Sequence, residues 1–203
     1  MEKLSEYFTG STGLTDEHFE QFIKLAEKKV LKKKDFLIKA GSVCDFVALI
    51  EQGVIRSFVI KGDEEFNTDF YFENNFTSVY SSYVNTLPSE HYIQALTDST
   101  VYIFPLEKME KLAASDLQWL KLGKYLAEFF LIRKCQREIS FLKQTAPERM
   151  ENMRLSYPGI EQKVQQYHLA SYLGIKPESL SRIKLLDYKE PVNSEPVILP
   201  KII

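Results

Sequence analysis

The chain has 203 residues and 44% of them are hydrophobic, so it can hold one large domain or two small ones around a real core. A net charge of −2 excludes a polybasic nucleic-acid binder, and two distant cysteines, Cys44 and Cys135, are too few for a four-thiolate iron–sulfur site. No apolar signal core or bilayer-length apolar stretch is present, so we expect a cytoplasmic protein with reduced thiols and no membrane contact.

The charge is distributed unevenly along the chain. Residues 1–115 carry 12 Lys and Arg against 18 Asp and Glu, whereas residues 116–203 carry 14 against 10. A modest positive excess in the second half is the direction that contacts with phosphate groups would favour.

The first 29 residues have a helical pattern. Within 14–28, apolar residues recur near helical spacing, and Thr15 is a candidate N-cap with His18 near the capping-box position. We therefore expect helix through residue 29.

From residue 30 to residue 104 the pattern changes to short strands separated by turn signals. The expected strands are residues 36–38, 46–50, 54–60, 66–72, 93–96 and 101–104. Short strands at this spacing favour a β-sandwich or jelly roll. A set of aromatic residues in this region is a candidate apolar ligand pocket, and the alternative is an aromatic core without a ligand. These residues are Phe66, Phe70, Phe72, Phe76, Tyr80 and Tyr83.

Two helices follow, a short one at 106–114 and a long, proline-free one at 117–143. In the long helix, one set of residues repeats at steps of three and four, which is the spacing of a coiled-coil seam. We predict that this set forms a homodimer interface; it consists of Leu122, Tyr125, Phe129, Ile132, Gln136 and Ile139. A second stripe is positioned to pack on the sheet, and it consists of Trp119, Leu126 and Phe130. The alternative is a helix buried on both stripes within a monomer.

The segment QYHLASYLGIKPESLSRIKL, residues 166–185, has the residue spacing of a helix-turn-helix. Ala170 allows the two helices to cross closely, Gly174 can adopt the left-handed conformation of the turn, and Pro177 suits the first turn of the second helix. Its open face can read base edges: Arg182 can bond guanine and Glu178 can accept from cytosine. The predicted DNA contacts are Lys176, Pro177, Glu178, Ser179, Arg182 and Lys184. The alternative is a helical hairpin in an ordinary core.

A jelly roll, a long helix and a C-terminal helix-turn-helix, in this order, resemble the Crp–Fnr family of bacterial transcription regulators. The resemblance covers roughly residues 20–186 and rests on Gly41 and Gly53 at turns of the roll, on FVALIEQGVIRSF, and on PERMENMRLSYPGI leading into LASYLGIKPESLSRI. The last stretch is the most specific, and it is similar to a compact subgroup of the family.

The resemblance implies an α+β fold in three parts. These are a jelly roll of the cyclic-nucleotide-binding type (1–115), a dimerisation helix (116–145) and a winged-helix-type DNA-binding domain (146–203) with a reduced wing. It also implies a homodimer that binds a two-fold symmetric operator on double-stranded DNA through a recognition helix at 177–186, with RNA polymerase as a further partner.

The sequence departs from the cyclic-nucleotide-binding members of that family. The family's glycine–glutamate pair is missing, Ser89, Glu90 and His91 stand where its arginine would be, and no arginine lies between Arg56 and Arg133. A carboxylate would repel a bound phosphate, so we predict that the roll does not bind cyclic AMP in the family manner and leave its effector unknown. The cysteine cluster of the oxygen-sensing branch is also missing, and in place of the usual wing there is a proline-rich tail with a candidate strand at 197–199.

Two other classes of function stay open. A cupin-like metalloenzyme needs two or three histidines and a carboxylate around one metal, but His18, His91 and His168 fall in separate segments and each is interpreted as a surface or capping residue. We therefore predict no catalytic residue, no metal and no cofactor. The other alternative is a jelly-roll ligand sensor that acts through protein contacts.

Overall fold

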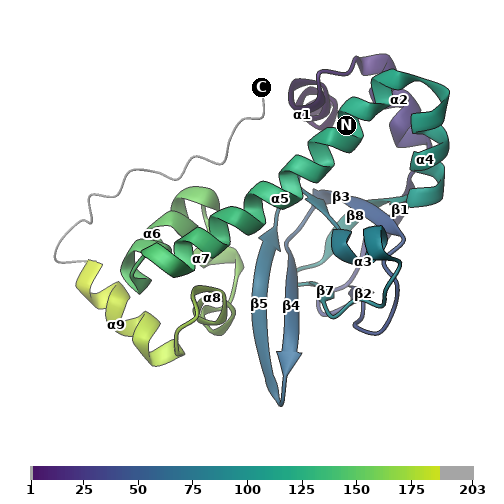
Figure 1. The fold of residues 1–203 in the computed structure, drawn as a ribbon. Helices are drawn as coiled ribbons and strands as arrows, with labels where there is room; N and C mark the ends of the chain where they lie inside the picture. The colour runs from purple at the N-terminus through teal and green to yellow at the C-terminus, as the bar shows by residue number, and fades with distance from the viewer. Residues whose placement is uncertain (1, 188–203) are drawn as a thin grey trace.

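The structure is a computed structural model that describes residues 2–187. One long helix joins a β part, which is covered by the N-terminal helices, to a group of C-terminal helices, as Figure 1 shows. The strand predicted at 197–199 and the reduced wing lie outside the described residues.

Eight antiparallel strands in the described residues form two four-stranded sheets, which confirms the predicted jelly roll. One sheet has the order β1 (Glu27–Leu31), β8 (Ser99–Pro105), β3 (Phe46–Gln52), β6 (Phe76–Thr77). The other has the order β2 (Phe36–Ile38), β7 (Tyr92–Ala95), β4 (Ile55–Lys61), β5 (Glu64–Tyr71). Alternating side chains of both sheets meet in a buried layer that contains Ile50, Ile55, Ile93 and Val101.

The prediction of helix through residue 29 was wrong at its end. Helices α1 (Glu2–Thr12) and α2 (Asp16–Lys24) are present, but residues 27–31 pair with β8 and form β1. The capping box at Thr15 is confirmed, because its hydroxyl accepts from the His18 N–H at 3.4 Å while the Thr15 N–H donates to His18 Nδ1 at 3.4 Å.

Helices cover one end of the roll. They are α1, α2, α4 (Leu106–Ser115), the 3₁₀ turn η1 (Leu117–Trp119) and the first half of α5 (Leu120–Lys143), while α3 (Tyr80–Asn85) follows β6. Stacking of Phe22 on Phe104, with ring centroids 3.8 Å apart, joins α2 to the sheet. The stripe of Trp119, Leu126 and Phe130 is buried in the same core, as predicted.

The second half of α5 leads into four more helices. These are α6 (Ala146–Ser156), α7 (Ile160–Lys163), α8 (Gln166–Leu173) and α9 (Pro177–Asp187). Their core, which includes Met150, Leu169, Leu173 and Leu180, also takes in Phe70 of β5. The C-terminal helices and strand β5 of the roll therefore share one hydrophobic core, and β5 lies beside α8 in Figure 1.

The aromatic residues predicted as one ligand pocket are divided between two packing layers. Phe70 and Phe72 pack with the C-terminal helices, Phe66 is exposed, and Phe76, Tyr80 and Tyr83 pack with the N-terminal helices. A register shift opposite Ser57 and Phe58 leaves Thr68 as an extra residue in β5, which ends the simple alternation. The six residues therefore do not converge on a single pocket.

Candidate nucleic-acid interface and its junction with the roll

The α8–turn–α9 unit has the geometry that its sequence spacing predicts. Gly174 adopts φ 68°, and the Ile175 N–H donates to the Ala170 carbonyl at 3.0 Å, which closes the end of α8. A Cβ at Gly174 would lie 2.6 Å from the ring of Phe141, so close approach of α5 adds a second reason for glycine. Ala170 and Leu180 are fully buried where the helices meet.

The face of α9 that points away from α8 is exposed to solvent. Lys176, Pro177, Glu178, Ser179 and Arg182 are all exposed, and the structure assigns no side-chain partner to Arg182 or Lys176 within residues 2–187. This leaves two cations and two hydrogen-bonding side chains available on one helical surface.

Lys184 is held differently from the other predicted DNA contacts. It is half-buried, and its ammonium lies 2.6 Å from Glu161 Oε1. The other oxygen of Glu161 accepts from Arg154 Nε at 2.8 Å. Lys184 therefore must leave an existing ion pair before it can contact a phosphate.

The predicted dimer seam on α5 needs correction at two positions. Leu122 and Tyr125 are only 3% and 5% exposed because they pack in the core of the roll and its N-terminal helices, and the Tyr125 hydroxyl lies 2.9 Å from that of Tyr7. The rest of the predicted seam is half-buried at Phe129, Ile132 and Gln136, and exposed at Ile139.

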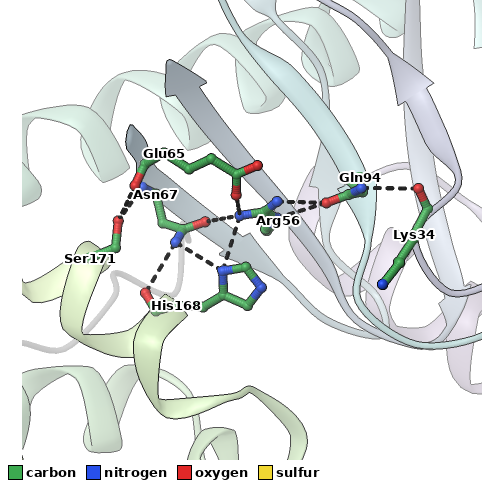
Figure 2. Close-up of polar contacts among 7 residues, drawn as sticks. All are labelled: Lys34, Arg56, Glu65, Asn67, Gln94, His168 and Ser171. Carbon is green, nitrogen blue, oxygen red and sulfur yellow. Dashed lines mark hydrogen bonds and ion pairs between the residues drawn. The ribbon is translucent and has the colours of Figure 1, made fainter. Parts of the chain in front are cut away.

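A polar cluster joins the roll to α8, as Figure 2 shows. At its centre is Arg56 of β4, whose Nε and Nη2 both donate to Gln94 Oε1, at 3.0 and 2.6 Å. Its Nη1 contacts Glu65 Oε2 at 2.6 Å and Asn67 Oδ1 at 3.2 Å, and donates to Nδ1 of His168 in α8 at 3.0 Å. Arg56 is 3% exposed, so its charge is matched by these contacts inside the protein.

The same contacts fix the protonation state of His168. Its Nδ1 faces two donors, Arg56 Nη1 and, at 3.3 Å, Asn67 Nδ2, so it must accept and the imidazole is neutral. Burial, followed by repulsion from Arg56, lowers the pKa of His168 to about 3. The interpretation of His168 as a surface or capping residue was therefore wrong.

A backbone link lies beside this cluster. The Asn67 N–H donates to Ser171 Oγ at 2.9 Å, and that hydroxyl donates to the Glu65 carbonyl at 2.8 Å. The Asn67 side chain also donates to the His168 carbonyl at 3.2 Å. The edge of β5 is therefore hydrogen-bonded to α8 rather than merely adjacent to it.

A second buried cluster joins three parts of the chain. Asp69 of β5 accepts from Nε of Arg133 in α5 at 2.9 Å, and the hydroxyl of Tyr157, at the end of α6, donates to Asp69 at 2.8 Å. Arg133 Nη2 also donates to the Phe70 carbonyl at 2.9 Å. Burial alone would raise the pKa of Asp69, but the Arg133 charge and the two side-chain donors hold that pKa below its usual value.

Sequence reasoning missed these junction residues. The available signal was Arg56, a charged residue at the second position of the largely apolar strand IRSFVIK, because an arginine is rarely buried without partners. One of those partners, His168, is 112 residues away along the sequence, so local sequence patterns did not identify it.

The segment around Ser89, where the sequence departs from the cyclic-nucleotide-binding pattern, is joined to residues 41–42 by backbone hydrogen bonds. The Gly41 N–H donates to the Ser89 carbonyl and the Ser89 N–H to the Ser42 carbonyl, both at 2.8 Å, while Glu90 is exposed. Arg56 is the one arginine in residues 1–132, and it is directed at α8.

The described residues contain neither a candidate metal site nor a helix suited to a membrane. Among the described residues, no group of three or more His, Cys, Asp or Glu side chains is placed to hold a metal ion. None of the helices within residues 2–187 combines the length and apolar character needed to cross a membrane.

Comparison with known proteins identifies the fold. Residues 28–116 match the family model described as the cyclic nucleotide-binding domain. The structure is similar to FixK2 from Bradyrhizobium japonicum (TM-score 0.68, 20% identity, 80% of this chain and 84% of that one). It is also similar to a protein described as a transcriptional regulator of the Crp–Fnr family from Eubacterium rectale (TM-score 0.67, 16% identity, 90% and 88%).

A mutant of CooA from Carboxydothermus hydrogenoformans is similar as well (TM-score 0.65, 17% identity, 84% and 82%). No curated protein sequence gave a significant match. The Crp–Fnr resemblance predicted from the sequence is thus confirmed as a shared fold, with a cyclic nucleotide-binding domain followed by the long helix and C-terminal helices.

Proposed function

We propose, from a fold shared with Crp–Fnr regulators, that this chain is a sequence-specific DNA-binding transcription regulator that acts as a homodimer. The observation that carries the proposal is the open face of α9, where Lys176, Glu178, Ser179 and Arg182 are exposed while Leu180 and Ile183 pack inward. Because α9 is packed on the protein through its inner face alone, its outer face can enter the major groove without breaking any contact within the described part of the protein.

The side chains of that face have distinct roles. Arg182 has the planar fork that bonds guanine O6 and N7, and Glu178 can accept from a cytosine amino group. Lys176, at the turn, is placed to contact a phosphate, which adds affinity without sequence preference. RNA polymerase is proposed as a further partner of the DNA-bound protein.

The dimer is proposed to form along the exposed side of α5. Apolar or small residues recur there at steps of four and seven, and Leu131 is 64% exposed although it lies in the middle of the helix. This stripe consists of Leu120, Ala127, Leu131, Cys135 and Leu142. Because it faces away from the core that contains Leu122 and Tyr125, a partner helix can pack on it without opening the protomer.

The roll is proposed not to bind cyclic AMP in the family manner. Arg56 is engaged with Gln94, Asn67 and His168, so it is not available to a phosphate near α3. Titration calorimetry of the purified protein with cyclic AMP should show no saturable heat, and saturable binding at micromolar concentrations would contradict this part of the proposal.

The DNA-binding proposal is tested by selecting bound sequences from random duplex DNA, with wild type and Arg182→Ala in parallel at near-physiological salt. Wild type should enrich a two-fold symmetric motif. Arg182→Ala should lose preference at one base pair of each half-site, at a cost of about 1–3 kcal/mol per site. Lys176→Ala is the matched comparison, because it should weaken binding evenly across sequences. No enrichment by wild type, with or without cell extract, would favour a sensor that acts through protein contacts.

A further inference from the structure

A cavity of about 180 Å³ lies where the roll, α5 and the C-terminal helices meet. Residues of β5, α5, α6 and α8 line it, so both parts of the chain contribute walls. Its volume is below the roughly 300–1,000 Å³ of pockets for drug-sized ligands, which fits a small metabolite or ion. We call it the hinge cavity.

The charges around the hinge cavity are unbalanced. Four cations and one carboxylate line it; they are Arg133, Lys134, Arg137, Arg149 and Asp69. Asp69 is already matched by the buried Arg133, which donates to it from Nε. The other three cations have no ion-pair partner among residues 2–187.

Two of those cations are brought together by one aromatic ring. The guanidinium groups of Arg137 and Arg149 each lie 4.8 Å from the ring centroid of Phe141. Burial, followed by repulsion from Arg137, lowers the pKa of Arg149. Two like charges held near each other without a counter-charge are unfavourable unless an anion joins them.

Backbone carbonyls satisfy only part of these two side chains. Arg137 Nη2 donates to the carbonyls of Asn67 and Tyr172, both at 3.0 Å. Arg149 donates from Nε to the Leu173 carbonyl at 3.1 Å and from Nη1 to the Gln144 carbonyl at 2.7 Å. Within the described residues Arg137 Nε and Nη1 and Arg149 Nη2 have no assigned partner, so N–H donors are left for a ligand.

Lys134 adds a third charge at the rim. Lys134 is exposed only in part, because nearby protein removes water from its ammonium, and it forms no hydrogen bond with the described part of the chain. Removal of its ammonium from water lowers the pKa of Lys134, and although Asp69 opposes the shift, Arg137 and Arg133 add to it. An anion in the cavity would relieve that repulsion.

We propose that the hinge cavity binds a small metabolite through a phosphate or carboxylate group, held by Arg137, Arg149 and Lys134. Planar guanidinium groups match the oxygen geometry of both kinds of anion, so the two sources share this chemistry. Because Arg137 also bonds Asn67 of β5 and Tyr172 of α8, an occupant strengthens the attachment of the C-terminal helices to the roll.

The proposal is tested by calorimetric titration of the full chain, without DNA, with inorganic pyrophosphate and separately with citrate at constant ionic strength. The variants are Lys134→Gln and Arg149→Gln. The matched control is Lys121→Gln, which removes an exposed lysine of the same helix that does not line the cavity. Hydrogen exchange with and without the better probe then locates the protection.

Wild type should bind at least one probe saturably, and the better probe identifies the phosphate or the carboxylate source. Arg149→Gln should weaken binding about tenfold or more, as expected for a lost charge-assisted hydrogen bond, while Lys121→Gln should not. Lys134→Gln should also weaken it, and since Lys134 bonds no described residue, this variant keeps the test valid if Arg149→Gln unfolds.

Protection should appear in both β5 and α6. No saturable binding of either probe would overturn the proposal. It would also be overturned if all three variants lost affinity equally, which indicates charge screening alone, or if protection were confined to α9.

Discussion

Arg133→Met should destabilise the folded protein by about 3–5 kcal/mol, the cost of leaving a buried charge without its partner. Methionine keeps much of the side-chain length but removes the donors to Asp69, the Phe70 carbonyl and the Tyr157 hydroxyl. Asp69 is only 6% exposed, so water cannot replace the lost charge. Against a typical total of about 5–15 kcal/mol, this is a large fraction of the stability.

The loss is measured by urea unfolding, followed by circular dichroism and by the fluorescence of Trp119, the one tryptophan of the chain. Tyr157→Phe is the graded comparison, and it should cost about 1–3 kcal/mol because one buried hydrogen bond is lost. Adding Asp69→Leu to Arg133→Met should recover most of the loss, since an apolar pair removes the unmatched charge. A loss below about 1 kcal/mol in Arg133→Met would refute the reasoning.

The pH dependence of the same variants gives an independent check. In wild type the pKa of Asp69 is lowered, so its contribution is present above the unfolded pKa near 3.9 and is lost as pH falls through the folded pKa. In Arg133→Met, burial without a cation raises that pKa, so protonation should relieve the penalty already in mildly acidic solution. The difference between the two proteins should therefore shrink on acidification.

Three further predictions concern the helix-turn-helix, the junction and the dimer. Gly174→Ala should cost about 1–3 kcal/mol in thermal unfolding because of its positive φ and the contact with Phe141, whereas Gly10→Ala in α1, with free space around it, should stabilise by up to about 1 kcal/mol. The pKa of His168 is lowered to about 3, so the stabilisation by its neutral form is present above the unfolded pKa near 6.5 and decreases as the pH falls. Between pH 7 and pH 5 the free energy of unfolding of wild type, measured in urea, should therefore fall by up to about 2 kcal/mol more than that of His168→Gln. Leu131→Glu should sediment as a folded monomer, while Leu122→Glu should unfold; a dimeric Leu131→Glu would contradict the proposed stripe.

Features set by local pattern were predictable. The strands between 36 and 104 follow turn signals, and Thr15 and Gly174 mark a helix start and a helix end through their own backbone chemistry. The open face of α9 follows from the same spacing, because burying Leu180 and Ile183 leaves Arg182 outside.

Features set by distant partners were not predictable from the pattern. Residues 27–31 form a strand through pairing with β8, although the charged run resembles a solvated helix end. On α5 several stripes have seam-like spacing, and only the packing of α1 and the roll shows that Leu122 and Tyr125 face inward. The contacts of Arg56 with His168 and of Arg133 with Asp69 join residues from separate elements, so their partners are visible only in the fold.

The central claim is that two copies of the α9 face read two half-sites on one side of a duplex. It is tested most directly by measuring the affinity of wild type for its selected duplex and for the same duplex with about five base pairs inserted between the half-sites. That insertion turns one half-site to the opposite side of the DNA, because half-sites read by a dimer lie about 10–10.5 base pairs apart or at multiples of this spacing. The account predicts that the insertion reduces binding to the level of a single half-site. Unchanged affinity would contradict it and would mean that each copy binds DNA alone.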